Sequence, residues 1–142
     1  MKLVLATQND DKIREIKKVL AGLPLEILTY QDFDYFPKVV EDQSTIEKNA
    51  HKKAKVIWEE FHIPTMADDT GLFVDALDGL PGVYSSRFAG AHATYKENRE
   101  KLLKLLKHIP FEKRTAEFKT IIALVTQSDK VITVEGKCKG FI

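Results

Sequence analysis

The pattern of apolar and polar positions predicts a strand and then a helix at the start of the chain. Residues 2–6 are rich in Leu, Val and Ala, as in a buried strand, and residues 7–11 form a polar turn. A helix is expected from about Lys12, and its apolar residues recur at helical spacing at Ile13, Ile16, Val19 and Leu20. Residues 25–28 predict a second strand, and residues 29–42 predict a loop rich in acidic side chains.

Two further helices are predicted by capping boxes, in which a Ser or Thr is followed three residues later by Glu. Ser44 and Glu47 should begin the first of them, and its inner face carries Ile46, Ala50, Ala54, Ile57, Trp58 and Phe61. Thr94 and Glu97 should begin the second, which ends at Pro110. Its apolar face is predicted at Leu102, Leu103, Leu105 and Leu106.

The remaining apolar segments predict strands. Residues 65–67 form a short strand, 68–71 a turn, and 72–74 a resumed apolar element. Residues 78–92 are rich in Gly and Pro and predict an ordered, irregular loop. Two segments rich in β-branched residues, 115–126 and 130–138, are separated by Gln127, Ser128 and Asp129 and predict a β-hairpin. The chain is therefore expected to be a single α/β domain over residues 1–142, with a mixed sheet.

Composition excludes several classes of protein. With 44% hydrophobic residues and 22 Lys plus Arg against 21 Asp plus Glu, the chain is a typical folded domain whose net charge gives no general attraction to nucleic acid or membranes. Cys138 is the only cysteine, so an internal disulfide and a zinc site built from several cysteines are excluded. The longest apolar run, 121–125, is far below the roughly 20 residues of a membrane-spanning helix, so a cytoplasmic protein is expected.

The first candidate site is the polar loop that contains Thr7, Gln8, Asn9 and Lys12. Backbone N–H groups at a helix N-terminus, together with a lysine in the first turn, favour binding of a phosphate. The alternative is a plain capped turn, with Asn9 or Asp10 as the cap and Lys12 in solvent.

The second candidate site contains the adjacent carboxylates Asp68 and Asp69. Because two neighbouring negative charges repel, a compensating cation is expected, and Mg²⁺ prefers such hard oxygen ligands. The alternative is an Asp-rich turn with Gly71 at positive φ. Glu41 in the acidic loop could supply a further metal ligand. Lys53 could contact phosphate, or could belong to a solvated basic helix face.

The third candidate is the loop 79–90, where Pro and Gly residues fix the backbone and Arg87 could bind an anion. The alternative is a structural loop in which Arg87 pairs with a nearby carboxylate.

Together, the identities, order and spacing of four motifs resemble the inosine triphosphate pyrophosphatase family. The resemblance covers the whole chain. The motifs are LATQN at 5–9 followed by Lys12, EKNA at 47–50 followed by Lys53 and Ala54, ADDTGL at 67–72, and LPGVYSSR at 80–87.

The resemblance implies a fold and a set of roles. The fold would be an elongated mixed sheet with flanking helices, in two lobes around a nucleotide cleft, usually in a homodimer. Thr7, Asn9 and Lys12 would bind the triphosphate and Lys53 would contact phosphate. Glu41 and Asp69 would be the metal ligands, Asp69 also the general base, and Thr70 a substrate contact.

Two departures from the family pattern matter. Asp42 and Gln43 stand where the family usually has Thr-Gly. Family members also continue beyond the equivalent of Ile142 with segments that contact the base, so the chain is expected to be C-terminally incomplete relative to the family and to discriminate poorly between bases.

The function implied is magnesium-dependent hydrolysis of non-canonical purine nucleoside triphosphates, such as ITP, dITP and XTP, to the nucleoside monophosphate and pyrophosphate. Two alternatives remain open. A signalling receiver domain also places acidic residues after strands, and a nucleotide-binding module would bind triphosphate without cleaving it.

Overall fold

The computed structural model describes residues 1–127 and 130–142. Within them lie the helices α1 (Asp10–Val19), α2 (Ile46–Phe61) and α3 (Tyr95–Leu105). The strands are β1 (Lys2–Leu5), β2 (Glu26–Leu28), β3 (Thr65–Val74), β4 (Pro81–Gly82), β5 (Thr115–Gln127) and β6 (Lys130–Phe141). Four short 3-10 segments join them: Tyr30–Asp32, Asp75–Leu77, Ser85–Arg87 and Phe111–Lys113.

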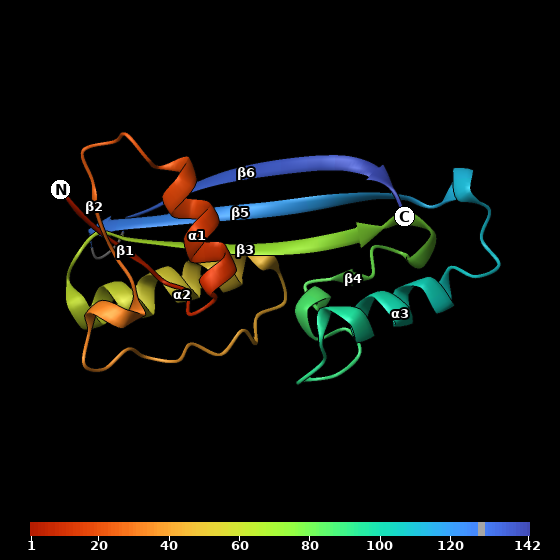
Figure 1. Cartoon of the computed structure of the whole chain (residues 1–142), viewed down its shortest axis with the longest axis horizontal. Coiled ribbons are helices and arrows are strands. Elements are labelled where there is room, and N and C mark those ends of the chain that lie inside the picture. Colours follow the sequence, from red (N-terminus) through yellow and green to blue (C-terminus); the bar gives the residue numbers. More distant parts are fainter. Residues whose placement is uncertain (128–129) are drawn as a thin grey trace. The chain divides into compact units, whose positions relative to one another are not determined.

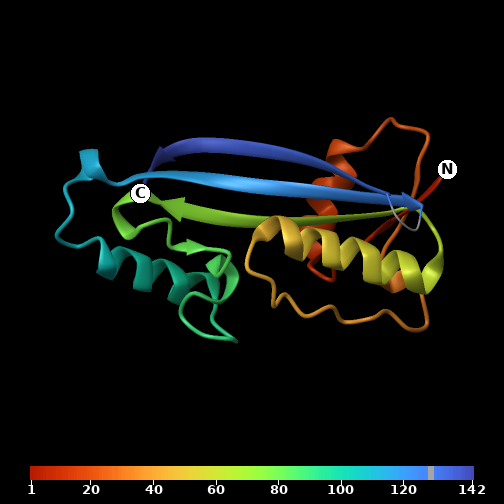
Figure 2. The same cartoon turned by 180° about the vertical axis from the view of Figure 1, so that it is seen from behind.

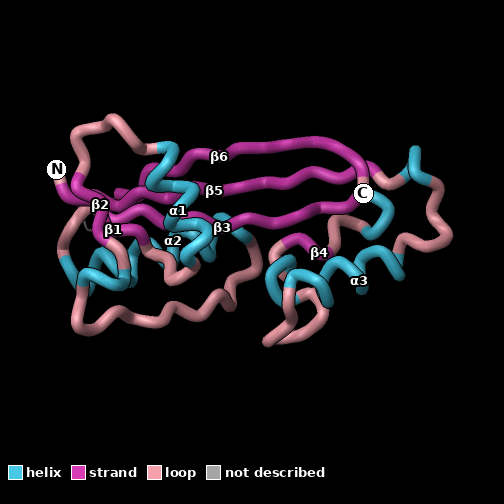
Figure 3. Tube along the Cα trace, viewed as in Figure 1, coloured by secondary structure: helices cyan, strands magenta, loops and turns pink. Residues whose placement is uncertain are grey.

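The strands form one mixed sheet in the order β2-β1-β3-β5-β6, and β4 pairs with β3 (Figure 3). β1 runs parallel to both of its neighbours, with Val4 opposite Leu28 on one side and Thr65 on the other. β4 runs antiparallel to β3. The predicted α/β fold with a mixed sheet is therefore confirmed, whereas the two lobes around a cleft stay a prediction.

The chain divides into two compact units. The first comprises Met1–Gln43, Glu47–Asp69 and Ile122–Val134. In this unit α1 and α2 cover opposite faces of the strands, since α1 lies in front of them in Figure 1 and α2 in Figure 2. Its fully buried side chains come from β1, α2 and β5, and include Val4, Leu5, Ala50, Ala54, Ile57, Ala123 and Val125. This core supports the carboxyl end of β1, where the polar loop begins.

The second unit comprises Ser44–Ile46, Thr70–Ile121 and Glu135–Ile142. Its core is built from Val74, Leu102, Leu106 and Ala116. The predicted capping box of α3 is confirmed, because the Thr94 hydroxyl accepts from the Glu97 N–H and the Glu97 carboxylate accepts from the Thr94 N–H.

The predicted apolar face of α3 included two residues that are exposed in the structure. Leu103 and Leu105 are 51% and 48% exposed, although their spacing near Leu102 suggested an apolar face. Leu102 and Leu106, which lie one turn apart, reach the core, whereas Leu103 and Leu105 lie at the sides of that buried stripe and stay exposed. The helix also ends at Leu105, well before Pro110.

The predicted turn at 68–71 is wrong. β3 runs without interruption from Thr65 to Val74, and Gly71 lies inside it. A Cβ at Gly71 would lie 2.7 Å from the Gly82 carbonyl oxygen of the paired strand. Glycine is needed there because another backbone approaches closely, not because the chain turns. The alternative with Gly71 at positive φ is therefore wrong as well.

The other boundaries differ only slightly from the predictions. α1 begins at Asp10 rather than Lys12, and α2 begins at Ile46, two residues after Ser44. β5 and β6 are neighbours in the sheet, as the hairpin prediction requires, although Ser128 and Asp129 lie outside the described residues. None of the helices in the described part of the chain has the length and apolar content that a membrane crossing requires.

Candidate functional site

The polar loop between β1 and α1 is an ordered helix cap. The Asn9 side-chain oxygen accepts hydrogen bonds from the Asp11 and Lys12 N–H groups at 3.0 and 3.2 Å. The Thr7 hydroxyl accepts from the Asn9 N–H at 3.1 Å. Gln8 is exposed. The capped turn is therefore confirmed, with Asn9 as the cap, and it fixes Thr7 and Asn9 at the carboxyl end of a buried strand.

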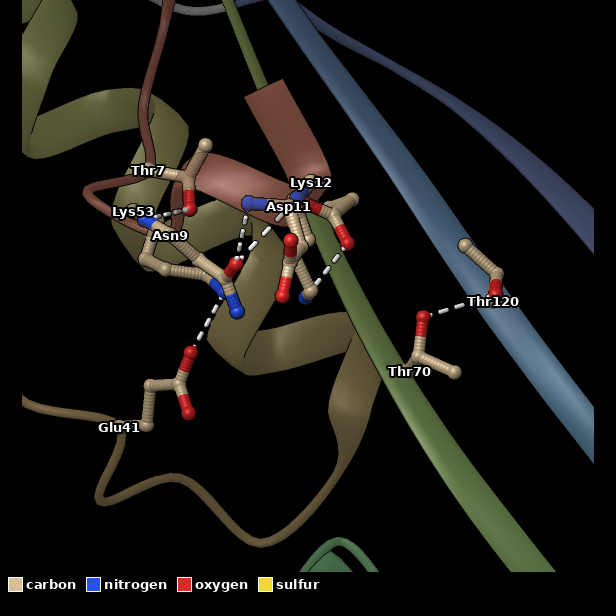
Figure 4. A network of polar contacts seen from close by, with 9 residues as sticks. Thr7, Asn9, Asp11, Lys12, Glu41, Lys53, Thr70 and Thr120 are labelled. Atoms are coloured by element: carbon tan, nitrogen blue, oxygen red, sulfur yellow. Dashed lines mark hydrogen bonds and ion pairs between the residues drawn. The ribbon is translucent and has the colours of Figure 1, made fainter. Parts of the chain in front are cut away.

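Lys12 connects this loop to β3, as Figure 4 illustrates. Its Nζ lies 2.6 Å from Asp68 Oδ2, so the alternative that Lys12 is solvated is wrong. Burial alone would lower the pKa of Lys12, but the charge and hydrogen bond of Asp68 outweigh burial, and the pKa is raised. The Asp68 side chain is only 8% exposed. Asp68 is therefore a buried anion that depends on this lysine for compensation.

Lys53 makes a second ion pair of the same kind. Its Nζ lies 2.6 Å from Glu41 Oε1, and its side chain is 9% exposed. Lys53 lies beside Ala50 and Ala54 on the buried face of α2, because residues three or four apart share a face. The solvated basic face is therefore the wrong interpretation for Lys53.

Asp69 lies in the same electrostatic environment. Burial raises the pKa of Asp69 above its ordinary value, and the Glu41 carboxylate adds to this rise. Lys53 and Lys12 act in the opposite direction and lower the pKa of Asp69, as does the Asn49 side chain. We call the five residues Glu41, Asp68, Asp69, Lys12 and Lys53 the charged cluster.

Asn49 is a site residue that sequence reasoning missed. It is fully buried in α2, and its side-chain oxygen accepts from the Gln43 N–H at 3.0 Å. This bond ties the segment that follows Glu41 to the helix that carries Lys53. An Asn on the apolar face of an amphipathic helix was the available signal, because a buried amide needs hydrogen-bond partners.

The charged cluster was tested for its fit to a divalent metal ion. No group of three or more Asp, Glu, His or Cys side chains in residues 1–127 and 130–142 is arranged to hold a metal. The donor chemistry nevertheless fits Mg²⁺, because the cluster offers only hard carboxylate oxygens. Asp68 Oδ1 is buried and has no hydrogen-bond partner among the described residues. Three carboxylates face two ammonium groups, which leaves one negative charge for a further cation.

Thr70 and Arg87 belong to the second unit. The Thr70 hydroxyl is 2.8 Å from that of Thr120. The Arg87 guanidinium lies over the Tyr84 ring, 5.2 Å from its centroid, and no carboxylate in the described part of the chain pairs with it. The alternative in which Arg87 pairs with a carboxylate is not supported there. The roles of both residues in binding stay predictions.

The chain is similar in sequence to a known family and to named relatives. The model of the Ham1 family matches residues 3–142. The dITP/XTP pyrophosphatase of Geobacter sulfurreducens is 48% identical over 141 residues, which cover 99% of this chain and 71% of the relative. The dITP/XTP pyrophosphatase of Thermoanaerobacter pseudethanolicus is 49% identical over 142 residues, covering 100% of this chain and 71% of the relative.

The fold of the chain is also similar to solved structures. A HAM1 protein from Coxiella burnetii has a TM-score of 0.90 and 34% identity, with 100% of this chain and 73% of that chain covered. A nucleoside-triphosphatase described as a dITP/XTP pyrophosphatase, from Mycobacterium abscessus, has a TM-score of 0.84 and 37% identity, with 100% and 74% covered.

Proposed function

The chain belongs to the Ham1 family, as its motifs predicted, and on this premise we propose that it hydrolyses non-canonical purine nucleoside triphosphates. The substrates would be dITP, XTP and ITP, and the products a nucleoside monophosphate and pyrophosphate. Homologues named dITP/XTP pyrophosphatase support the substrate class. The observation that carries the proposal is the charged cluster, in which the buried Lys53, the partly buried Lys12 and three carboxylates come together.

Asp69 would act as the general base that takes a proton from the attacking water. Burial and the nearby Glu41 carboxylate raise its pKa, so a carboxylate at this position holds a proton better than one in solvent. The buried Asn49 amide, which also acts on the pKa of Asp69, would help to orient the carboxylate. No nucleophilic side chain is needed, since water attacks the α-phosphorus directly.

Glu41, Asp69 and Asp68 are the residues that would hold Mg²⁺, which supplies neutralisation of phosphate charge when bound. Lys12 and Lys53 would bind the phosphates of the leaving pyrophosphate. Thr7 and Asn9 would contact the triphosphate through their side chains, since the cap places both at the start of α1. These residues orient the anhydride and stabilise the charge that accumulates on the leaving group.

Two other functions remain as alternatives. A receiver domain needs regular alternation of strands and helices, whereas β5 and β6 follow one another without a helix. A nucleotide-binding module without catalysis would retain the lysines but release no product.

A panel of dITP, XTP, ITP, dGTP and ATP with Mg²⁺ tests the proposal, with pyrophosphate and orthophosphate measured separately. We expect pyrophosphate and nucleoside monophosphate. Orthophosphate as the primary product would contradict attack at the α-phosphorus, and binding without any product would favour the non-catalytic module.

A further inference from the structure

In the described structure, both lysines of the charged cluster are bonded to carboxylates. Lys53 Nζ is 2.6 Å from Glu41 Oε1, and Lys12 Nζ is 2.6 Å from Asp68 Oδ2. The proposed function asks the same lysines to bind phosphate and the same carboxylates to bind a divalent cation. Each group therefore has one partner in this structure and a different partner in the complex with substrate.

Lys53 is the more constrained of the two lysines. Its side chain is 9% exposed, against 30% for Lys12. Among the positive charges that lower the pKa of Asp69, Lys53 has a larger effect than Lys12. Its ammonium group therefore compensates both Glu41 and Asp69, two of the three carboxylates that the proposed function assigns to the metal.

A divalent cation bound to these carboxylates would be repelled by the positive charge of the Lys53 ammonium group. In a buried site such repulsion is screened little by solvent or salt, so the two cations compete for the same oxygens. A triphosphate resolves the competition, because its oxygens offer the ammonium group a new anionic partner.

We propose that Lys53 is a built-in counter-cation that occupies Glu41 until substrate arrives and then transfers to the phosphates. The divalent cation consequently binds weakly to the free chain and cooperatively with the triphosphate. This inference rests on the proposed function and deepens it, because it adds a coupling between the metal and the substrate. By linkage, the triphosphate and the cation raise each other's affinity by the same factor.

Calorimetric titration with Mn²⁺ in the absence of nucleotide tests the inference. We expect Lys53→Met to bind Mn²⁺ more tightly than the unmodified chain, by about tenfold, a typical size for coupling between two sites. This direction is diagnostic, because losing a mere structural contact would weaken binding or leave it unchanged. Equal or weaker binding of Mn²⁺ by folded Lys53→Met would overturn the inference.

Lys52→Met is the matched control. Lys52 neighbours Lys53 on α2 and also bonds to the acidic segment, with its Nζ 2.7 Å from Asp42 Oδ1 and 2.9 Å from the Val40 carbonyl oxygen. Because its partner is Asp42 rather than Glu41, its loss should leave the Mn²⁺ affinity unchanged. A rise of the same size in both variants would indicate a general charge effect and would contradict the specific role of Lys53.

A second measurement uses the unmodified chain, in case Lys53→Met does not fold. The ¹⁵N signal of the Lys53 ammonium group should stay in place when Mg²⁺ is added alone, and should move when Mg²⁺ and inorganic tripolyphosphate are added together. Movement with Mg²⁺ alone would overturn the inference. Neither measurement depends on turnover, so failure of the proposed function, seen as no pyrophosphate from dITP or XTP, is a separate result.

Discussion

Asp69 is the general base and a metal ligand in the proposed mechanism. Its replacement by Asn keeps the shape of the side chain and removes its ability to accept a proton. We expect Asp69→Asn to lower turnover of dITP by about 100-fold or more, since a general base typically contributes 10² to 10⁴. Steady-state release of pyrophosphate is the measurement. Near-normal turnover by the folded variant would remove Asp69 from the mechanism.

The same substitution should stabilise the fold at neutral pH. Burial raises the pKa of Asp69 in the folded chain, so ionising this group costs more in the folded state than in the unfolded state. The cost is absent below the unfolded pKa, where Asp69 is protonated in both states, and grows as the pH rises through the folded pKa. The Asp69→Asn variant avoids this cost because the Asn side chain does not ionise.

Thermal unfolding across a pH series measures this effect. The midpoint for Asp69→Asn should exceed that of the unmodified chain by about 2 °C at pH 7, as for a small change in stability of a domain of this size, and the two should converge in acid. An advantage that persists unchanged at low pH would point to a cause other than ionisation.

Glu41 differs from Asp69 because it lies in an irregular segment and pairs directly with Lys53. Glu41→Gln should raise the Mg²⁺ concentration needed for half-maximal rate by about tenfold, since one anionic ligand is lost. Asp42→Asn is the control, because Asp42 bonds to Lys52 rather than to the charged cluster. Equal Mg²⁺ dependence of the two variants would show that Glu41 is not a ligand.

The sequence singled out the residues of the charged cluster as candidates, but it did not predict their contacts with one another. Glu41 and Lys53 were singled out by residue type and motif, yet a lysine among several lysines on one helix is indistinguishable from a solvated one. The difference arises from tertiary packing, which buries Lys53 and leaves Lys52 partly exposed. The pairing of Lys12 with Asp68 joins distant segments and has no local signal.

Among the elements, β3 illustrates how a local signal can mislead. Asp-Asp-Thr-Gly is a common turn composition, but β3 lies between β1 and β5 inside the sheet, where a continuous strand is favoured. The capping signals at Asn9 and Thr94 were reliable, since a helix cap depends on only a few neighbouring residues.

Gly71 gives a direct test of the strand assignment. An added Cβ would lie 2.7 Å from the Gly82 carbonyl oxygen and 2.8 Å from the Phe73 ring. Gly71→Ala should therefore lower the free energy of unfolding by about 1–3 kcal/mol, as overpacking does. Urea unfolding measures the change.

Gly136→Ala is the control for this variant, because Gly136 lies in β6 and a Cβ there would meet nothing within 4 Å. Its stability should change by less than about 0.5 kcal/mol. If both alanines were tolerated equally, the close approach of β3 and β4 at Gly71 would be contradicted.

The exposed edge strand β6 is the feature that bears on whether copies of the chain associate. β6 is the last strand of the sheet, and Ile132 and Val134, which share a face, are 44% and 61% exposed. Edge strands with apolar side chains favour pairing with another chain, and we therefore propose that β6 contributes to the homodimer that the family resemblance implies.

Val134→Lys should therefore shift the protein toward monomer in sedimentation equilibrium, by about tenfold or more in dissociation constant. Val19→Lys serves as the control, since Val19 is 81% exposed and lies on α1 rather than on β6. A monomer at all concentrations, or an equal effect of both lysines, would exclude β6 as the interface.

The chain spans about 71% of the length of its relatives from Geobacter sulfurreducens and Thermoanaerobacter pseudethanolicus, and the charged cluster lies wholly within it. We propose that this cluster directs water to the α-phosphorus of a nucleoside triphosphate. Hydrolysis of dITP in ¹⁸O-labelled water with Mg²⁺, followed by mass spectrometry of both products, is the test of this attack. We predict the label in the nucleoside monophosphate and none in the pyrophosphate. Label in pyrophosphate, or orthophosphate as the first product, would contradict the account.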